Sequence, residues 1–136
     1  MIDATRGMII ERDDGEGAPS QACHGAPRRD CFATLAKFKR IYMIDVGTFE
    51  TDSTVRKIGY IDLMDIADPD HKARLGGSNG RFDFPFFTIE NVDKVDGQHI
   101  VVANDNNLPF SAGRAVNQAD NNEFMLLRVP EFLNAR

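Results

Sequence analysis

The stretch Met8-Ile9-Ile10-Glu11-Arg12-Asp13-Asp14 matches a second stretch, Ile100-Val101-Val102-Ala103-Asn104-Asp105-Asn106. Each is an apolar run that ends in an acidic or amide cluster and leads into a long polar loop. A second apolar run then follows each loop, and these two runs also align, as residues 41–49 with residues 124–132. Repetition on this scale is typical of architectures in which one unit must stack on its neighbours to bury its face. Because the repeated runs have the length of strands, we expect them to form blades of a β-propeller.

The remaining pattern predicts strands that are separated by turns and by two long loops. The predicted strands are residues 6–13, 40–46, 55–66, 86–92, 99–104 and 124–129, and the loops are residues 14–38 and 105–122. Asp96-Gly97 marks a hairpin turn. Residues 131–136 carry a helical pattern, and residues 66–74 carry a weaker one. The chain is therefore expected to be all-β.

Six strands in a meander correspond to about one and a half four-stranded antiparallel blades, with the long loops on one face. Part of a propeller leaves blade faces and strand edges exposed. We therefore expect residues 1–136 to be the C-terminal fragment of a longer propeller chain, whose remaining blades would be partners of this one. Met1 would then be an internal methionine of that chain, and an export signal would lie outside the sequence.

The composition excludes some functions. The chain has 136 residues, of which 42% are hydrophobic, enough for the core of one domain. Its formal net charge of -5 and pI near 5.1 argue against a nucleic-acid partner, since no basic patch could displace counterions. No apolar stretch is long enough to span a bilayer, and residues 1–7 do not have the pattern of a signal peptide.

Cys23 and Cys31 are the only cysteines, eight positions apart in the first long loop. They could form a disulfide in an oxidising compartment or remain free thiols. With His24 they could also bind a metal, although structural zinc sites require four ligands and the loop offers three. The sequence leaves these alternatives open.

Several motifs resemble one known family. They are Ile10-Glu11-Arg12-Asp13, Lys39-Arg40-Ile41-Tyr42, Asn104-Asp105-Asn106-Asn107-Leu108-Pro109 and Ser111-Ala112-Gly113-Arg114. Their order and spacing are similar to the C-terminal part of secreted phytase-like proteins described as having esterase-like activity, and the resemblance covers nearly the whole chain. It implies a β-propeller-like fold, export from a bacterial cytoplasm to an extracellular or periplasmic location, and hydrolysis of a small anionic ester or phosphoester.

The repeat also predicts a site. Asp13 and Asp105 occupy equivalent strand ends, which in a propeller project on the same face, so the two long loops should meet there. Oxygen ligands near these ends suit Ca²⁺, and the predicted set is Glu11, Asp13, Asn104, Asp105 and Asn107. Arg12 and Arg114 would bind a phosphate or carboxylate in bidentate fashion. In this hypothesis Asp105, Arg12 and Arg114 are catalytic, and a metal-bound water attacks the ester.

Other interpretations compete with this site. Asp and Asn at strand ends commonly cap turns, and Arg12 could pair with Asp13 or Glu90. No Gly-x-Ser-x-Gly elbow is present, so Ser111 is the nearest candidate nucleophile, in a position more typical of a turn. The chain could instead be a non-catalytic propeller that binds a ligand, a glycan or a protein, with calcium only holding its loops, or an inactive truncation product.

Overall fold

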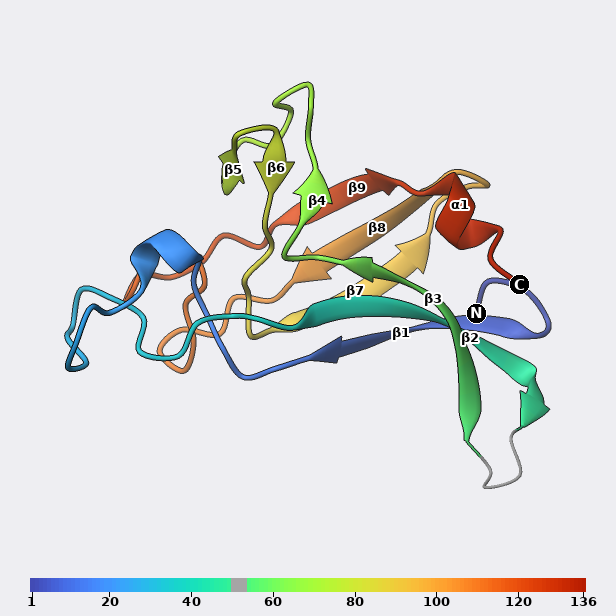
Figure 1. The fold of residues 1–136 in the computed structure, drawn as a ribbon, viewed down its shortest axis with the longest axis horizontal. Helices are drawn as coiled ribbons and strands as arrows, with labels where there is room; N and C mark the ends of the chain where they lie inside the picture. Colours follow the sequence, from blue (N-terminus) through green and yellow to red (C-terminus); the bar gives the residue numbers. More distant parts are fainter. Residues whose placement is uncertain (50–53) are drawn as a thin grey trace.

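The computed structural model describes residues 1–49 and 54–136, which are built mainly from antiparallel strands (Figure 1). One sheet has the order β1 (Arg6–Arg12), β2 (Lys39–Phe49) and β3 (Val55–Asp62), and another has β7 (Ile89–Lys94), β8 (His99–Asn104) and β9 (Phe124–Arg128). A small sheet has the order β4 (Ile66–Ala67), β6 (Arg81–Phe82) and β5 (Gly77–Ser78). The other elements are a 3-10 turn, Pro19–Gln21, and one helical turn, α1 (Pro130–Leu133).

The all-β prediction is confirmed, but the predicted blades are not. Each sheet in the described part of the chain has three strands rather than four, and no closed ring is formed. The propeller therefore stays a prediction. Among the described residues, no helix has the length and apolar character that crossing a bilayer requires.

The prediction of a helix over residues 66–74 was wrong. Ile66–Ala67 forms strand β4, and a turn follows it. The Asp68 carboxylate accepts the backbone N–H groups of Lys72 and Ala73 at 2.8 and 3.0 Å, while the backbone of His71 has a positive φ of 52°. Side-chain capping of this kind competes with helical hydrogen bonds. The helix predicted near the C-terminus is present only as the single turn α1.

The core lies between the two larger sheets, with β1 beside β7. Strand β2 contributes Ile41 and Met43, and the chain between β6 and β7 contributes Phe84 and Phe86, whose rings meet edge to face with centroids 4.7 Å apart. Such aromatic pairs add to the stability gained from burial. These phenylalanines therefore belong to the core.

The repeat is present as two equivalent strand pairs, but their registers differ. Ile10 lies opposite Ile41 in the β1–β2 pair. The sequence alignment would place Val102 opposite Phe124, whereas Val102 lies opposite Met125. A shift of one residue turns every side chain to the other face of a strand. As a result Ile41 is fully buried and Phe124 is 76% exposed, so the alignment of the second strands was wrong by one residue.

The two long loops meet at one end of the molecule, away from the chain termini (Figure 1). The Gln21 side chain donates a hydrogen bond to the carbonyl of Arg114 at 2.6 Å, and Asn117 donates to the carbonyl of Arg29 at 3.1 Å. The expectation that residues 14–38 and 105–122 come together is confirmed.

A disulfide joins Cys23 and Cys31 within the first of these loops. Beside it, the N–H of Cys23 donates to the carbonyl of Phe32 at 3.0 Å, and the N–H of Phe32 donates to the carbonyl of Gln21 at 2.9 Å. Of the three alternatives that the sequence left open, the structure has the disulfide. The cross-link closes a short segment that packs against the second loop.

Replacing both cysteines should destabilise the protein. In the chain-entropy account, closing a loop of this length restricts the unfolded chain by about 2–3 kcal/mol. The Cys23→Ala/Cys31→Ala variant should therefore unfold at lower urea concentration, as followed by far-ultraviolet circular dichroism. Ser20→Ala, an exposed change in the same loop, serves as the control. A double variant as stable as this control would contradict the expected contribution.

Candidate functional site

Asp13 connects the two ends of the first long loop. One carboxylate oxygen, Oδ2, accepts the N–H groups of Lys37 and Phe38 at 2.8 and 2.9 Å. The other, Oδ1, accepts the N–H of Gly15 at 3.2 Å and lies 2.8 Å from the ammonium of Lys39. The side chain predicted to bind a metal is thus already surrounded by donors.

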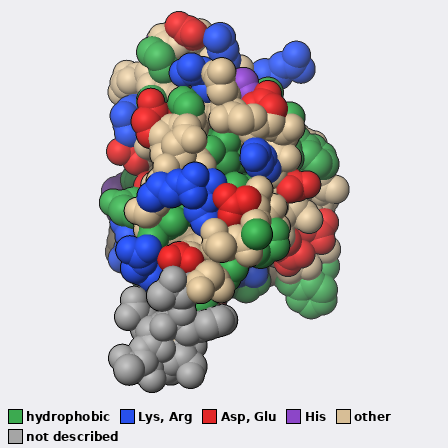
Figure 2. Space-filling view, turned by 90° about the vertical axis from the view of Figure 1, so that its right-hand side faces the viewer, with side chains coloured by type: hydrophobic (Ala, Val, Ile, Leu, Met, Phe, Trp, Pro, Cys, Tyr) green, Lys and Arg blue, Asp and Glu red, His purple; other side chains and the backbone are tan. Residues whose placement is uncertain are grey.

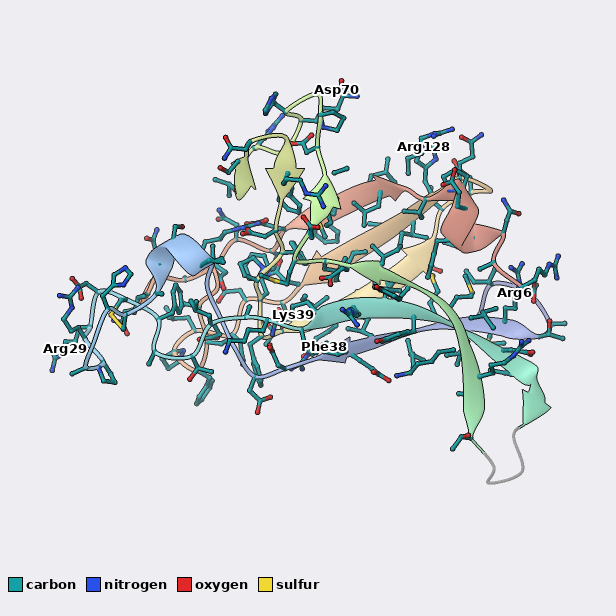
Figure 3. The ribbon with its side chains drawn as sticks, in the orientation of Figure 1. Arg6, Arg29, Phe38, Lys39, Asp70 and Arg128 are labelled. Carbon is teal, nitrogen blue, oxygen red and sulfur yellow. A yellow bond between two sulfur atoms is a disulfide. The ribbon has the colours of Figure 1, made fainter. Side chains whose placement is uncertain are left out.

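Lys39 is a fully buried cation at the start of β2 (Figure 3). Besides the Asp13 carboxylate, its Nζ donates to the carbonyls of Asp13 and Gly15 at 2.6 and 2.8 Å. An ammonium has three donors, and each has an oxygen partner here. Burial lowers the pKa of Lys39, while the hydrogen bond and charge of Asp13 oppose that effect.

The pKa of Asp13 lies below its usual value. Partial burial would raise it, but the hydrogen bond from Lys39 and the backbone N–H groups outweigh that effect. The pKa values of both partners are therefore lowered. The burial penalty falls mainly on the fully buried ammonium, whereas the Asp13 side chain remains 30% exposed. Lys39 and Asp13 together form an internal ion pair at the end of β1.

The equivalent end of β8 is also held by internal hydrogen bonds. The Asn104 side chain is buried; its Oδ1 accepts the N–H of Glu123 at 2.7 Å and its Nδ2 donates to the carbonyl of Asn121 at 3.3 Å. Asp105 is exposed, and its backbone N–H donates to the carbonyl of Thr88 at 2.8 Å. These bonds fix the start of the second long loop.

The predicted calcium ligands are not gathered into a ready site. Glu11 pairs with Lys57, and the Lys39 ammonium lies beside Asp13, where a cation would have to lie. In residues 1–49 and 54–136, no group of three or more His, Cys, Asp or Glu side chains is placed to hold a metal ion. As arranged, these residues do not fit a calcium ion, since Asp13 would first have to release Lys39. Calcium binding stays a prediction.

Arg114 is engaged by the protein itself. Its Nε and Nη2 donate to the two carboxylate oxygens of Glu123 at 2.9 and 2.8 Å, and its Nη1 lies 3.2 Å from Oδ1 of Asp83. The guanidinium also stacks on Phe86, 4.9 Å from the ring centroid. A Cβ at Gly76 would lie 2.2 Å from Nη1, so a larger residue there would collide with Arg114.

Arg12 has a different environment. Its guanidinium lies over the ring of Phe87, 4.5 Å from the centroid, a favourable cation–π arrangement. Its positive charge also lowers the pKa of the buried Lys39. Arg12 is thus placed near the ion pair, at the end of β1.

A hollow of about 230 Å³ lies where the two long loops meet, and we call it the interloop hollow. Residues of both loops line it. Its lining residues are Glu16, Cys31, Phe32, Ala33, Leu108, Pro109, Phe110, Ser111, Ala112, Val116 and Asn117.

Glu16 and Ser111 are the reactive side chains of this lining. Oε1 of Glu16 accepts the backbone N–H of Ala112 at 3.1 Å, across a sequence separation of 96 residues. Burial raises the pKa of Glu16, and the negative charge of Asp120 adds to the effect, whereas the Ala112 hydrogen bond, the charge of Lys39 and a hydrogen bond with the Ser111 hydroxyl oppose it. The net direction is upward, and a raised carboxyl pKa is typical of groups that exchange protons in catalysis.

Asp120 fixes the chain next to Ser111. It is buried, and its two carboxylate oxygens accept the N–H groups of Gly113 and Arg114 at 2.6 and 3.0 Å. Three successive N–H groups, those of residues 112–114, are therefore held by two carboxylates. No local motif links residues so far apart, so the sequence does not identify Glu16 or Asp120 and places Ser111 in a position typical of a turn.

A smaller hollow of about 130 Å³ lies near the chain termini, and it is more basic. Its lining includes Arg6, Arg56 and Arg136. Arg6 pairs with Asp3 at 2.7 Å, and Arg56 pairs with Asp45 at 3.1 Å. Figure 2 shows the right-hand side of the view in Figure 1, where Lys and Arg side chains lie beside Asp and Glu side chains. Internal pairing thus offsets much of the positive charge here.

The Asp13–Lys39 pair should make stability fall in acid. The folded-state pKa of Asp13 is below its unfolded value, so its contribution is present above the unfolded pKa and is lost as pH falls through the folded one. The unfolding free energy, measured in urea from about pH 7 to about pH 2, should therefore depend less on pH in Asp13→Asn. Asp14→Asn, which changes the exposed neighbouring residue, should keep the pH dependence of the wild type. An equal pH dependence of the unfolding free energy in the wild type and both variants would contradict the contribution assigned to Asp13.

Replacing Arg114 should destabilise the fold. Arg114→Met leaves Asp83 and Glu123 partly buried without their cation, and an unpaired buried charge costs about 3 kcal/mol. Arg128→Met, a change of an exposed arginine, should cost less than about 0.5 kcal/mol. Urea unfolding measures both effects. Equal stability of the two variants, with hydrolysis lost only in Arg114→Met, would instead favour the anion-binding role predicted from the sequence.

Comparison with known proteins supports the resemblance seen in the motifs. The profile of one family, described as "Phytase-like: Esterase-like activity of phytase", matches residues 1–108. The curated proteins contain no significant match, and neither do the solved structures. The matched segment includes β1, β2 and the first long loop, together with the start of the second. Since the profile covers well over half of the sequence, the chain belongs to the phytase-like family.

Proposed function

We propose that the protein hydrolyses ester or phosphoester bonds and that its substrate binds in the interloop hollow. Membership of the phytase-like family points to a hydrolase. The observation that carries the proposal is the presence of Glu16 and Ser111, a proton acceptor and a hydroxyl, in the lining of one hollow.

Glu16 supplies the general base. Its carboxylate is held by the N–H of Ala112, so its position relative to the hollow is fixed before substrate binds. A base of this kind takes a proton from the attacking hydroxyl group and returns one to the leaving group. Since only ionised Glu16 can accept a proton, the rate should rise with pH through the raised pKa of this residue.

We also propose dependence on a divalent metal, with Ca²⁺ as the first ion to test. What supports this part is the exposed carboxylate of Asp105 at the end of β8, which is accessible to an ion. The Asp13–Lys39 pair opposes it, because a bound ion would have to displace the ammonium.

An extracellular or periplasmic location is part of the same proposal. The Cys23–Cys31 disulfide supports it, since disulfides persist in oxidising compartments and are rare in the reducing cytosol. The disulfide also lies in the loop that forms one side of the hollow, so reduction would be expected to loosen that side.

Assays of two model substrates test the activity and its metal dependence. p-Nitrophenyl butyrate and p-nitrophenyl phosphate are incubated with the purified chain in calcium or in a chelator. We expect hydrolysis of at least one of them. If a metal takes part, chelation or Asp105→Ala should abolish turnover while the melting temperature of the variant stays unchanged.

Other outcomes are equally informative. Full turnover in chelator would remove the metal from the proposal and leave the hydrolase in place. The absence of turnover of either substrate, with a cooperative thermal transition, would favour a non-catalytic protein whose loops bind a ligand.

A further inference from the structure

We propose that Ser111 is the nucleophile and Glu16 the general base of this hydrolase, and that its substrate is an uncharged carboxylic ester with an apolar acyl group. The inference rests on the proposed hydrolase function and adds the catalytic residues and the substrate class.

The chain holds Ser111 in a defined position. Its backbone N–H donates to the carbonyl of Asn107 at 3.1 Å, and the next residue, Ala112, donates its N–H to Glu16. Gly113 lies so close to the core that a Cβ there would be 2.5 Å from the ring of Phe86. The segment is therefore fixed on both sides of Ser111, which favours a preorganised catalytic group over a freely moving loop serine.

The rim of the hollow is apolar and exposed. Phe110 is 84% exposed and Leu108 is 43% exposed, and both line the hollow together with Phe32 and Val116. Exposed apolar side chains that border a concave site are typical of ligand-binding surfaces. An acyl chain that covers Phe110 would remove apolar surface from water, so the rim should favour apolar acyl groups.

The charge of the lining favours a neutral substrate. Glu16 is negative when it acts as a base, and none of the described lining residues is a lysine or an arginine. The nearby ammonium of Lys39 has its donors already in use. A phosphomonoester dianion would face repulsion from Glu16 without a compensating cation in the lining, whereas an uncharged ester would not.

The proposed reaction has two balanced steps. In the first, Ser111 Oγ bonds to the ester carbonyl carbon and its proton passes to Glu16, while the bond from that carbon to the alcohol oxygen breaks and the alcohol leaves with the proton from Glu16. In the second, water attacks the acyl carbon and gives a proton to Glu16. The acyl bond to Oγ breaks, the carboxylic acid leaves, and the proton returns to Ser111.

A fluorophosphonate probe, kinetics and mass spectrometry test the assignment. The probe should phosphonylate wild-type Ser111 with loss of fluoride, and the mass increase should map to the peptide that contains this residue. With p-nitrophenyl butyrate, Ser111→Ala and Glu16→Gln should each lower kcat by about 100-fold or more. Ser78→Ala, an exposed serine in β5, is the matched control and should change nothing.

The substrate class has its own test. Phe110→Ala should raise KM for the butyrate ester about tenfold with little effect on the acetate ester. Phe124→Ala removes a similarly exposed ring from β9 and serves as the control. Thermal melts verify that each variant is folded. Ser111→Cys is a conservative second variant of the nucleophile, and an acylating substrate should still modify it.

The outcomes separate this inference from the broader function. Hydrolysis that survives both Ser111→Ala and Glu16→Gln would overturn the site and leave the hydrolase standing. Loss of activity in Glu16→Gln alone, with no labelling of Ser111, would overturn the nucleophile, and a preference for the phosphomonoester would overturn the substrate class. A wild-type chain that neither hydrolyses any of the substrates nor reacts with the probe would overturn both proposals.

Discussion

Arg114 joins three parts of the chain, two through its guanidinium and the third through its backbone carbonyl. It binds Glu123, just before β9, and Asp83, just after β6, while its own carbonyl accepts a hydrogen bond from Gln21 in the first long loop. Its face also rests on Phe86 in the core. Since a guanidinium can make several directed bonds at once, the side chain fixes the second loop against the core, and the backbone carbonyl of the same residue links that loop to the first. The second loop, which Arg114 anchors, lines one side of the interloop hollow.

The carboxylates of the two long loops, and that of Asp13 just before the first, differ in how their charge is compensated. Asp13 meets a fully buried ammonium, that of Lys39, and Asp120 meets two backbone N–H groups. These carboxylates have strong partners and serve to hold the loops. Glu16 differs, because burial dominates its environment and raises its pKa, and because it lines the hollow. A rigid sheet scaffold that presents a reactive group on packed loops is a common arrangement in enzymes.

The sequence predicts the long strands because each carries several residues of regular apolar pattern. The strand predicted over residues 55–66 ends at Asp62, however, and the one predicted over residues 86–92 spans Ile89–Lys94. The sequence could not predict β4, β5 and β6, since strands of two residues contain no period. The helix predicted over residues 66–74 does not form, because the Asp68 carboxylate accepts backbone N–H groups of the turn that follows it. The second repeated strand was misaligned by one residue because the apolar run around Met125 contains too many apolar residues to show which face is buried.

The candidate site was predicted only in part. Residue type and the repeat predicted Asp13, Asp105 and Arg114, none of which lines the interloop hollow, whereas the predicted meeting of the two loops is confirmed. Glu16 was not identified, since its contact with Ala112 spans 96 residues and has no local motif. Arg114 was predicted because a guanidinium binds anions, but its carboxylate partners could not be deduced from its neighbours in the sequence.

The sequence by itself determined the all-β class, the family, the two long loops and the presence of two cysteines that could pair. These properties follow from local composition and from motifs that are read along the chain. Only the tertiary structure decided which charges neutralise one another and which carboxylate is left to line a hollow. The reason is physical: the energy of a charged group depends on its burial and on neighbours a few ångströms away, and here folding brings those neighbours together from distant parts of the chain.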